Sequence, residues 1–569
     1  MNALLIHNDN LPTALISNFK NTLKFNIGYA QTLEFDFTFD KEAHNQLNDA
    51  LGNKSFDTIF IPYSLSVNNY LELSGLRLAL HIRLTNEFGH KNTPIVFLGH
   101  ETKEQITKIS DYGSFLFSPG IFNTSKFEYH HLEEQHNWVI NNWKENSESL
   151  LNKREYDLFL SRTTIKPATS HLSNHSLVNE WAIYQWAKLI NSEDNNCFHQ
   201  IFSKIDTDLY FNYLKALHPI SRQNVIDRKD LEIRFSGEAP KVLLIDDESD
   251  KGWADLFVDI FEEFYFYDIP SYDFKNKSLN ELLKFCLNNI EELKIDLVIL
   301  DFRLLPQDHI VNKLEEISSI KLLKAIKLYN PGIQVVVFSA TDKVWNLNAL
   351  QRAGADGFVN KGASIELQNK YSVKKSIESL VEQVQESMSL RYLKTIFTLL
   401  YKIKNNINSC EYEDDSSFHG FIIELKEHVG LIEELGRNLG KSPKSTDFMF
   451  LACFHFLEKF KNQYFIQDRR KQVFIGLERV DCKMYRLSGD TITKSGKLID
   501  QHNSWFNAIV NLLVDYFEVL PTTHSEFRII DKLAKLRNNY IHEDMQSIES
   551  ENIVHIVELM DLVTTKMKE

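Results

Sequence analysis

Short apolar runs alternate with helix-like spacing over the first 125 residues of the chain. The runs NALLIH, DTIFIP, PIVFLG and GSFLFSP have the length and composition of strands buried on both faces of a parallel sheet. The segments between them, such as residues 70–87, place apolar residues at helical intervals. Strands that alternate with helices predict a doubly wound α/β domain over residues 1–125.

The pattern changes between residues 126 and 238, where no run reads convincingly as a strand. In the stretch SLVNEWAIYQWAKLI, Val178, Trp181, Tyr184 and Trp186 recur at helical spacing. We predict a helical connector whose aromatic side chains are core residues. A ligand pocket formed by the same side chains is the alternative.

The α/β pattern returns between residues 239 and 385 in the runs KVLLIDD, IDLVILD, IQVVVFSA and GADGFVNKG. Each run ends in polar residues, and ligands of open parallel sheets bind at the carboxyl ends of the strands. We therefore expect one site at that edge of the sheet. Its polar residues are Asp246, Asp247, Asp301, Ser339 and Lys361.

In motif content and order, residues 240–385 resemble the receiver domain of two-component response regulators. The resemblance implies a phosphoacceptor, bound Mg²⁺, a set of switch residues, and a histidine kinase or other phosphodonor as a partner. The matching positions are the phosphoacceptor Asp301, the metal ligands Asp246, Asp247 and Asp301, and the switch residues Ser339, Phe358 and Lys361.

The chemistry of phosphoryl transfer explains why such residues stand together. A carboxylate is a poor nucleophile toward a phosphoryl group unless the charge on the transferred oxygens is neutralised. Mg²⁺ prefers oxygen ligands and supplies two positive charges, and Lys361 supplies a third. The hydroxyl group of Ser339 is then placed to hydrogen-bond the phosphoryl group.

Two features depart from the family pattern. The stretch Pro306–Ile320 after the acceptor is longer and more charged than usual, which predicts altered kinase docking. Gly362 follows Lys361 where the family commonly has proline, so the usual cis turn is not expected. A receiver that is driven by partner binding instead of phosphorylation is an alternative that these residues leave open.

The first α/β segment aligns on the second as a degenerate copy. The positions of the acidic pair, the acceptor, the hydroxyl group and the lysine are taken by His7 with Asn8, Pro62, Gly99 and Ser118. Such a domain cannot accept a phosphoryl group by the same mechanism. We expect it to bind a partner, a dimer mate or a small ligand.

From about residue 376 the pattern becomes all-helical. Residues 378–405 carry one long helical pattern, which we interpret as a signalling or dimer helix. The segment Val480–Lys497 contains turn residues and predicts an inserted loop or hairpin. Residues 505–520 are apolar, but polar residues such as Asn507 and Asn511 interrupt them, so we predict an amphipathic helix and no membrane span.

The hexapeptide RNNYIH, residues 537–542, follows an apolar stripe at helical spacing. An Arg, a polar residue and a His after four intervening positions resemble the motif of the HEPN family, all-helical domains of RNA-cleaving toxins and defence effectors. The resemblance implies an endoribonuclease without a metal cofactor. In it, His542 serves the attack of the ribose 2′-hydroxyl group, Arg537 stabilises phosphate charge and Asn538 orients the phosphate.

Residues five apart on an ideal helix diverge by about 140°. Arg537 and His542 could converge where the helix frays or across the twofold axis of a homodimer, and HEPN nucleases resemble the second case. The family association also implies a role in stress or anti-phage defence, with a possible defence-system partner protein. The chain contains the looser Arg–His spacing twice more, at Arg83/His90 and at Arg303/His309.

The motif has structural interpretations as well, because Arg and His near a helix end often cap carbonyls or pair with acidic residues. A non-catalytic HEPN-like interaction module and an unrelated helical output domain therefore stay open. Further candidates for this site are Glu458 and Lys459, and for phosphate contact Arg469, Arg470 and Lys471.

Composition narrows the choice of environment. A formal net charge of −15 argues against a generally basic nucleic-acid coat, although a local phosphate site is compatible with it. Five scattered cysteines without a CxxC pair indicate reduced thiols. With no signal-peptide pattern at the N-terminus, we expect a cytoplasmic protein without a membrane partner.

The combined prediction is a multidomain α/β and all-α protein. A degenerate receiver-like domain (1–125) and a helical connector (126–238) precede a receiver domain (239–385) and a helical HEPN-like effector domain (386–569). Both α/β domains are expected to be doubly wound and flavodoxin-like. Phosphorylation or partner binding at the receiver would gate RNA cleavage, and a non-catalytic two-component signalling adaptor is the alternative.

Overall fold

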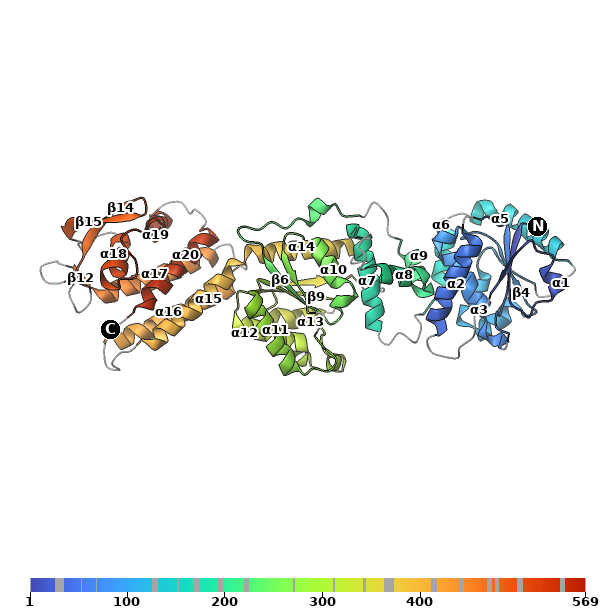
Figure 1. Ribbon diagram of the computed structural model, residues 1–569, viewed down its shortest axis with the longest axis horizontal. Helices are drawn as coiled ribbons and strands as arrows, with labels where there is room; N and C mark the ends of the chain where they lie inside the picture. Colours follow the sequence, from blue (N-terminus) through green and yellow to red (C-terminus); the bar gives the residue numbers. More distant parts are fainter. Residues whose placement is uncertain are drawn as a thin grey trace. The chain divides into compact units, whose positions relative to one another are not determined.

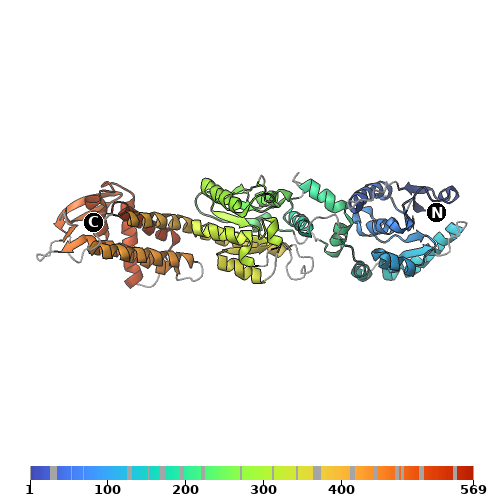
Figure 2. The ribbon, with the colours of Figure 1, turned by 90° about the horizontal axis from the view of Figure 1, so that it is seen from below.

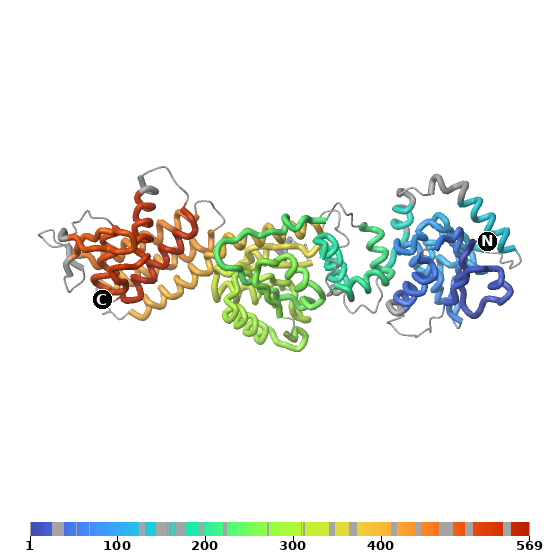
Figure 3. The backbone as a smooth tube through the Cα atoms, turned by 45° about the horizontal axis from the view of Figure 1, so that its top comes forward, coloured from blue at the N-terminus to red at the C-terminus, as the bar shows by residue number. Residues whose placement is uncertain are grey.

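The computed structural model describes most of the chain, and Figure 3 draws the remaining residues in grey. The chain divides into two compact units. The first comprises residues 1–232, 250–260 and 361–378, and the second comprises residues 233–249, 261–360 and 379–569. The described residues are 2–25, 35–52, 54–67, 69–124, 131–150, 153–166, 174–192, 198–219, 225–269, 272–310, 313–340, 344–362, 373–410, 417–439, 445–467, 473–475, 480–498, 505–542 and 548–567.

Five parallel strands form the sheet of the first unit, in the order β2-β1-β3-β4-β5, with helices packed around them (Figure 1). This is the order of a flavodoxin-like doubly wound sheet, so the α/β prediction for the segment is confirmed. The strands are β1 (Ala3–His7), β2 (Asn21–Lys24), β3 (Thr58–Pro62), β4 (Ile95–Leu98) and β5 (Ile121–Thr124). The helices between them are α1 (Thr13–Ile16), α2 (Phe35–Leu51), α3 (Ser74–Leu84) and α4 (Lys103–Ile109), with 3-10 turns η1 (Tyr70–Glu72), η2 (Asn86–Phe88) and η3 (Asp111–Phe117).

The strand predicted for GSFLFSP, the fourth of the predicted runs, is wrong. Those residues form most of η3 and the turn after it, and the strand is β5, a few positions further along the chain. The hydroxyl oxygen of Ser110 accepts a hydrogen bond from the N–H of Tyr112 and so starts the 3-10 turn. Phe115 and Leu116 are buried from that turn, which gave the segment its strand-like apolar run. Ser118 consequently precedes β5, and it does not occupy the strand-end position of Lys361.

The predicted connector is helical in the residues described, but it is not separate from the first sheet. Phe159, Leu160 and Leu209 belong to the same hydrophobic core as that sheet. Trp181 and Trp186 are fully buried, so these aromatic residues are core residues as predicted. The elements are α5 (Leu132–Leu150), α6 (Lys153–Arg162), α7 (Asn174–Ile190), α8 (His199–Thr207), α9 (Leu209–Leu217) and the 3-10 turn η7 (Arg228–Leu231).

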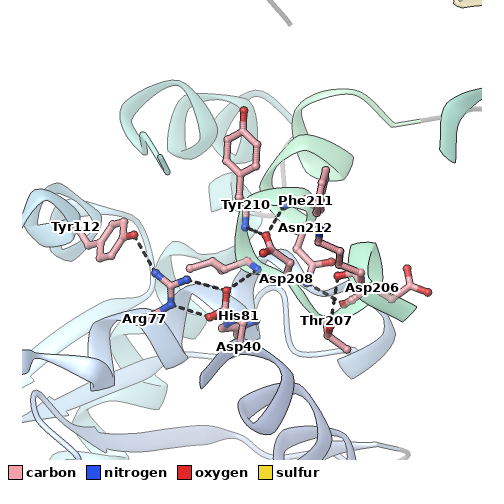
Figure 4. Close-up of polar contacts among 12 residues, drawn as sticks. Asp40, Arg77, His81, Tyr112, Asp206, Thr207, Asp208, Tyr210, Phe211 and Asn212 are labelled. Carbon is pink, nitrogen blue, oxygen red and sulfur yellow. Dashed lines mark hydrogen bonds and ion pairs between the residues drawn. The ribbon is translucent and has the colours of Figure 1, made fainter. Parts of the chain in front are cut away.

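A buried carboxylate joins α9 to the first sheet's helices (Figure 4). Asp40 of α2 accepts hydrogen bonds from Arg77 Nε at 2.6 Å, from Arg77 Nη2 at 2.7 Å and from the backbone N–H of Leu209 at 2.9 Å. The imidazole Nε2 of His81 lies 2.8 Å from the same carboxylate. Burial acts to raise the pKa of Asp40, but the charges and hydrogen bonds of Arg77 and His81 outweigh it and lower that pKa to about 2.

The sheet of the second unit repeats the first, with five parallel strands in the order β10-β9-β8-β6-β7. Counted along the chain, its strand order is the same as that of the first sheet. The strands are β6 (Lys241–Ile245), β7 (Tyr265–Tyr267), β8 (Leu297–Leu300), β9 (Gln334–Ser339) and β10 (Gly357–Asn360). The helices of this stretch of sequence are α10 (Trp253–Ile260), α11 (Leu279–Leu293), α12 (Ser318–Tyr329) and α13 (Val344–Ala353), with 3-10 turns η8 (Ser249–Lys251), η9 (Pro306–His309) and η10 (Leu314–Glu316).

The C-terminal part of the second unit is a helical bundle around one hydrophobic core. Leu400, Ile422, Phe456, Leu533 and Met560 come from five different helices and are fully buried in that core. The helices of the bundle are α15 (Tyr392–Ser409), α16 (Ser417–Arg437), α17 (Ser445–Tyr464), α18 (Trp505–Asn511) with the π-helical turn η11 (Leu512–Tyr516), α19 (Glu526–His542) and α20 (Ser550–Thr565). The helix α14 (Val373–Ser389) precedes them in the chain.

Three details of the C-terminal prediction need correction. The single helix expected over residues 378–405 is two helices, α14 and α15, with Leu390 and Arg391 in a turn between them. This stretch of the chain is drawn from yellow to orange in Figure 2. The region is also not all-helical, because strands are inserted between α17 and α18. They are β11 (Phe465–Gln467), β12 (Val473–Ile475), β13 (Val480–Asp481), β14 (Lys483–Ser488) and β15 (Thr491–Leu498), and the last two form the predicted hairpin.

The third correction concerns the polar residues of residues 505–520. Asn507 and Asn511 are buried and do not form a solvent-facing stripe. The side-chain oxygen of Asn507 accepts from the N–H of Tyr485 at 2.7 Å. Asn511 bonds both the N–H and the C=O of Lys483, at 3.0 and 2.8 Å. The asparagines thus provide hydrogen-bond partners for backbone groups at the edge of β14 and hold the hairpin against α18.

None of the described helices is long and apolar enough to cross a membrane.

Replacing Asp40 by Asn should destabilise the first unit by about 3 kcal/mol, because it leaves the largely buried Arg77 and the fully buried His81 without their anionic partner. The lowered pKa of Asp40 means that its stabilisation is present above pH 3.8 and is lost as the pH falls toward about 2. As the pH falls through that range, the free energy of unfolding of the variant, measured with urea, should therefore decrease less than that of the parent. Asp49→Asn, at an exposed position of the same helix, is the control and should leave both quantities unchanged.

Candidate functional site

The predicted acidic and hydroxyl residues of the second sheet share one edge. Ile245 pairs with Leu300, and Leu300 pairs with Val337, so β6, β8 and β9 lie side by side in register. Asp246 and Asp301 are the next residues after the first of these pairs, and the N–H of Asp301 donates to the carbonyl of Ile245 at 2.9 Å. Ser339 ends β9 at the same edge. All three polar side chains are buried.

Backbone donors orient the two buried carboxylates. Asp301 Oδ2 accepts from the N–H of Arg303 at 2.9 Å, and Asp246 Oδ1 accepts from the N–H of Glu248 at 2.8 Å. Asp247, the other predicted metal ligand, is exposed. Sequence reasoning missed Glu248, which is buried within this acidic turn and adds a third buried carboxylate to the strand ends.

These residues fit a partly hydrated Mg²⁺ ion. Asp246 and Asp301 offer hard oxygen ligands on neighbouring strand ends, and Mg²⁺ typically binds one or two carboxylates while keeping several waters. Within the described ranges, no group of three or more His, Cys, Asp or Glu side chains is assembled as a metal cage. A fully protein-ligated cage is therefore not what these strand ends present.

Lys361, the first residue after β10, is anchored by aromatic residues. Its side chain is fully buried, and its ammonium nitrogen lies 5.4 Å from the centroid of the Trp253 ring. Its carbonyl oxygen accepts a hydrogen bond from Trp186 Nε1 at 3.0 Å. Gly362 follows with φ +72°, a conformation that favours glycine, and the described peptide bonds include no cis bond. Phe358, the predicted aromatic switch, is half-buried against the core of the second sheet.

The charged stretch after the acceptor is tied down by one buried carboxylate. Asp308 accepts from the N–H groups of Leu304 and Leu305, at 3.0 and 3.1 Å, and from the N–H and hydroxyl groups of Ser318. The hydroxyl group of Ser319 donates to the carbonyl of Phe302. The start of α12 is thereby fastened to the strand end that carries Asp301, and sequence reasoning did not assign Asp308 this role.

The corresponding edge of the first sheet is filled instead of open. Pro62 ends β3 and pairs with Leu98 on β4. A Cβ atom added at Gly99 would lie 2.5 Å from the ring of Tyr63, which is itself buried and stacked on Phe97 at 5.0 Å. Gly99 of the first sheet corresponds to Ser339 of the second. The ring of Tyr63 therefore takes the space in which the side chain of Ser339 would lie. At this point the first sheet has a proline at the position of Asp301, and the ring of Tyr63 takes the space beside it.

The opposite edge of the second sheet binds the first turns of α15. Lys394 Nζ lies 2.7 Å from Asp296 Oδ1, on the residue just before β8. Asn330, before β9, donates to the carbonyl of Lys394 and to the hydroxyl of Thr398, both at 3.1 Å. At Gly332 a Cβ atom would lie 2.3 Å from the backbone of Leu393. The helix and the base of the sheet are thus in direct backbone contact.

Arg537 of the predicted nuclease motif lies on α19 and contacts α17. Its Nη2 lies 3.1 Å from Glu458 Oε1, and its guanidinium lies 5.6 Å from the centroid of the Phe454 ring. Its Nη1 also donates to the side-chain oxygen of Asn538 at 3.2 Å. Glu458, one of the additional candidates, therefore joins this cluster, whereas Lys459 pairs with Glu424 on α16.

Some predicted residues of this region fall outside the description. The side chain of His542 is not among those that the structure describes, although its backbone ends α19. Arg469, Arg470 and Lys471 also lie outside the described residues. In the looser pair Arg83/His90 both residues are buried. Arg83 donates to the carbonyls of Lys91 and Gly120. The ring nitrogens of His90 lie 3.0 Å from the hydroxyl of Thr93 and from the carbonyl of Lys54, so both residues have structural roles.

Comparison with known proteins bears on the first α/β segment. Residues 10–124 match the family model of the inactive receiver domain. The chain therefore carries a receiver-like segment, and the prediction of a degenerate receiver at the N-terminal end is confirmed. No curated protein matches the chain.

Two solved structures are similar to parts of the chain. One is a LuxR-family two-component response regulator from Aurantimonas sp. SI85-9A1, with 15% identity and a TM-score of 0.18, covering 26% of this chain and 86% of that one. The other is described as a two-component system response regulator/GGDEF domain protein, with 12% identity and a TM-score of 0.19, covering 68% of this chain and 99% of that one. The HEPN resemblance stays a prediction.

Gly332→Ala should separate α15 from the base of the second sheet, because the added methyl group meets backbone that cannot rotate away. We expect a loss of roughly 1–3 kcal/mol in the free energy of unfolding, measured by urea denaturation. Gly430→Ala is the matched control, since a Cβ atom at that helical position meets nothing within 4 Å. The control should be neutral or slightly stabilising, by up to about 1 kcal/mol. Equal stability of the Gly332→Ala variant and the parent would contradict the close approach.

Proposed function

We propose that this chain is a two-component-type signalling protein whose second α/β segment accepts a phosphoryl group on Asp301 and controls RNA cleavage by the C-terminal helices. The receiver-like segment already connects the chain with two-component signalling. One observation carries the rest of the switch proposal. Asp246 and Asp301 are buried on adjacent strand ends beside Ser339, whereas the same edge of the first sheet presents Pro62 and a tyrosine ring.

In this proposal an Asp301 oxygen attacks the phosphorus atom of a phosphodonor, and the bond from phosphorus to the donor's leaving group breaks. The product is an acyl phosphate on Asp301. Bound Mg²⁺ would supply the charge neutralisation that the transferred oxygens require. The N–H of Arg303 fixes the orientation of the Asp301 carboxylate, and the Ser339 hydroxyl group is the hydrogen-bond donor for the new phosphoryl group.

The route to the C-terminal helices runs through α15. This helix packs in the C-terminal core along its length, and its first turns hold Asp296 and Asn330 at the base of the second sheet. In this proposal, phosphorylation of Asp301 shifts the strands at their carboxyl ends. The shift is transmitted to the α15 contacts at the amino ends of the same strands. The pairing of two C-terminal bundles, each contributing one Arg537–His542 motif, is the step that we propose to be controlled.

Arg537 is the described part of the proposed RNA site. The Arg537 side chain is about one third exposed (32%), so a phosphate group can reach its guanidinium. Glu458 and Phe454 hold the guanidinium in place, which orients its remaining N–H donors. In the proposed reaction Arg537 stabilises the phosphate charge, and His542 acts in proton transfer from the ribose 2′-hydroxyl group.

The same contacts favour a second candidate function. A guanidinium that is paired with Glu458 and stacked over Phe454 also serves as a structural brace between α17 and α19. In that case the helical domain is a non-catalytic adaptor that recruits a protein partner under control of the receiver. RNA cleavage assays separate the two functions.

Asp301→Asn should abolish labelling of the full-length protein by ³²P-acetyl phosphate in the presence of Mg²⁺, because an amide oxygen is not a competent nucleophile. The label on the parent protein should also be released by hydroxylamine, as expected of an acyl phosphate. Asp273→Asn, at an exposed turn of the same segment, is the control and should label normally. Labelling that survives Asp301→Asn would show that the acceptor is a different residue.

His542→Ala should lower the rate of RNA cleavage by at least about 100-fold, which is typical for the loss of a general acid–base group. The assay compares labelled RNA incubated with the full-length protein, with and without acetyl phosphate and Mg²⁺. His555→Ala, on α20, is the control histidine and should retain activity. RNA that stays intact with phosphorylated, dimeric parent protein would decide for the adaptor.

A further inference from the structure

A polar cavity of about 730 Å³ lies at the base of the second sheet, beside the turn between α14 and α15. Its walls come from the segment before β6, from the residues before β8, and from the facing ends of α14 and α15. Ser550, the first residue of α20, contributes from the C-terminal helices. The cavity adjoins the amino ends of the strands, whereas Asp301 stands at their carboxyl ends, so the two sites are distinct.

The cavity walls carry an excess of positive charge, although the chain as a whole is acidic. Five cationic side chains line the cavity together with two carboxylates, those of Glu238 and Asp296. Two of the cations are engaged, because Lys394 pairs with Asp296 and Arg391 donates to the carbonyl of Glu238, both at 2.7 Å. The other three form no side-chain hydrogen bond or ion pair within the described part of the chain; they are Arg234, Lys241 and Lys294.

Such a concavity attracts anions. Like charges gathered around one hollow repel each other, and an anion between them removes that repulsion while gaining charge-assisted hydrogen bonds. Arginine and lysine side chains are the usual protein ligands of phosphate groups. A monovalent anion would neutralise only part of the excess, so several phosphate charges match this site better than one.

The size and the aromatic lining indicate what else the ligand carries. A volume of about 730 Å³ lies within the range of small-molecule sites, which is about 300–1,000 Å³. Phe235 and Tyr392 also line the cavity. Phe235 is held in place by an edge-on contact with Phe264, with ring centroids 5.3 Å apart. A fixed aromatic ring offers a surface for a flat heterocycle.

We infer that this cavity binds a small, multiply phosphorylated anion of nucleotide size. Its phosphate groups lie among Arg234, Lys241 and Lys294, and a base, where one is present, packs beside Phe235 and Tyr392. A nucleoside polyphosphate and an inorganic polyphosphate share the phosphate chemistry that the site recognises. The inference stands on the cavity alone and does not require that Asp301 accepts a phosphoryl group.

The position of the cavity gives the ligand a role in signalling. The side chain of Gln385 on α14 bonds both backbone groups of Arg234 at 2.8 Å, and Arg391 fills the turn between the two helices. A bound anion contacts these residues and lowers the repulsion among the neighbouring cations. Binding therefore stabilises the α14–α15 turn, and the ligand acts as a second input at the junction between the sheet and the C-terminal core.

Calorimetric titration of the full-length protein tests this inference directly. The probes are ATP, inorganic tripolyphosphate, orthophosphate and adenosine, all without Mg²⁺ so that the phosphate charges stay accessible. We expect saturable binding of ATP or tripolyphosphate, at least about tenfold tighter than that of orthophosphate or adenosine. Tighter binding of ATP than of tripolyphosphate identifies a nucleotide as the source, and equal binding identifies the phosphate chain. The affinity should fall as the salt concentration rises.

The double variant Arg234→Glu/Lys241→Glu should weaken this binding by at least about tenfold, since it replaces two attractive charges by repulsive ones. Lys324→Glu, at an exposed position of α12 outside the cavity, is the matched control and should bind like the parent. Unfolding midpoints of all three proteins show whether the variants are folded. The inference is overturned if neither ATP nor tripolyphosphate binds at millimolar concentration, or if a folded double variant binds as tightly as the parent.

Discussion

The contact between α15 and the base of the second sheet is the constraint on which the rest of the second unit depends. Lys394 pairs with Asp296, Asn330 bonds the same turn of α15, and Gly332 lets the two backbones meet. The same helix supplies fully buried residues to the C-terminal core. One helix therefore joins the base of the second sheet to the C-terminal core, with no flexible linker between the two.

The two parallel sheets share one topology but differ in the residues at their strand ends. Their strand orders are the same. In the second sheet those ends hold buried carboxylates that backbone N–H groups orient. In the first sheet the ring of Tyr63 fills the corresponding space, and Pro62 stands where the second sheet has Asp301. The first sheet keeps the fold because the fold depends on its buried strands, which the loss of the site leaves intact.

The buried central strands could be predicted from sequence because a continuous apolar run is itself the cause of their burial. The short edge strands β2 and β7 were not predicted, since they are partly exposed and lack such a run. The acidic strand ends were found by their order along the chain. Asp308 and Glu248 were missed because their roles depend on loop backbone that sequence spacing does not reveal. Asn507 and Asn511 were predicted to lie on the polar face of an amphipathic helix. Helical spacing does not reveal that the β14–β15 hairpin provides their hydrogen-bond partners.

The hydrogen bond from Trp186 to the carbonyl of Lys361 has a practical consequence for anyone who dissects this chain. A fragment of residues 239–385 lacks the indole that donates a hydrogen bond to the backbone carbonyl of Lys361. It also exposes Trp253, on which Trp186 packs edge-on at 5.6 Å. Trp186, Trp253 and Lys361 lie in one compact unit, so a fragment that keeps these contacts of Lys361 has to include α7.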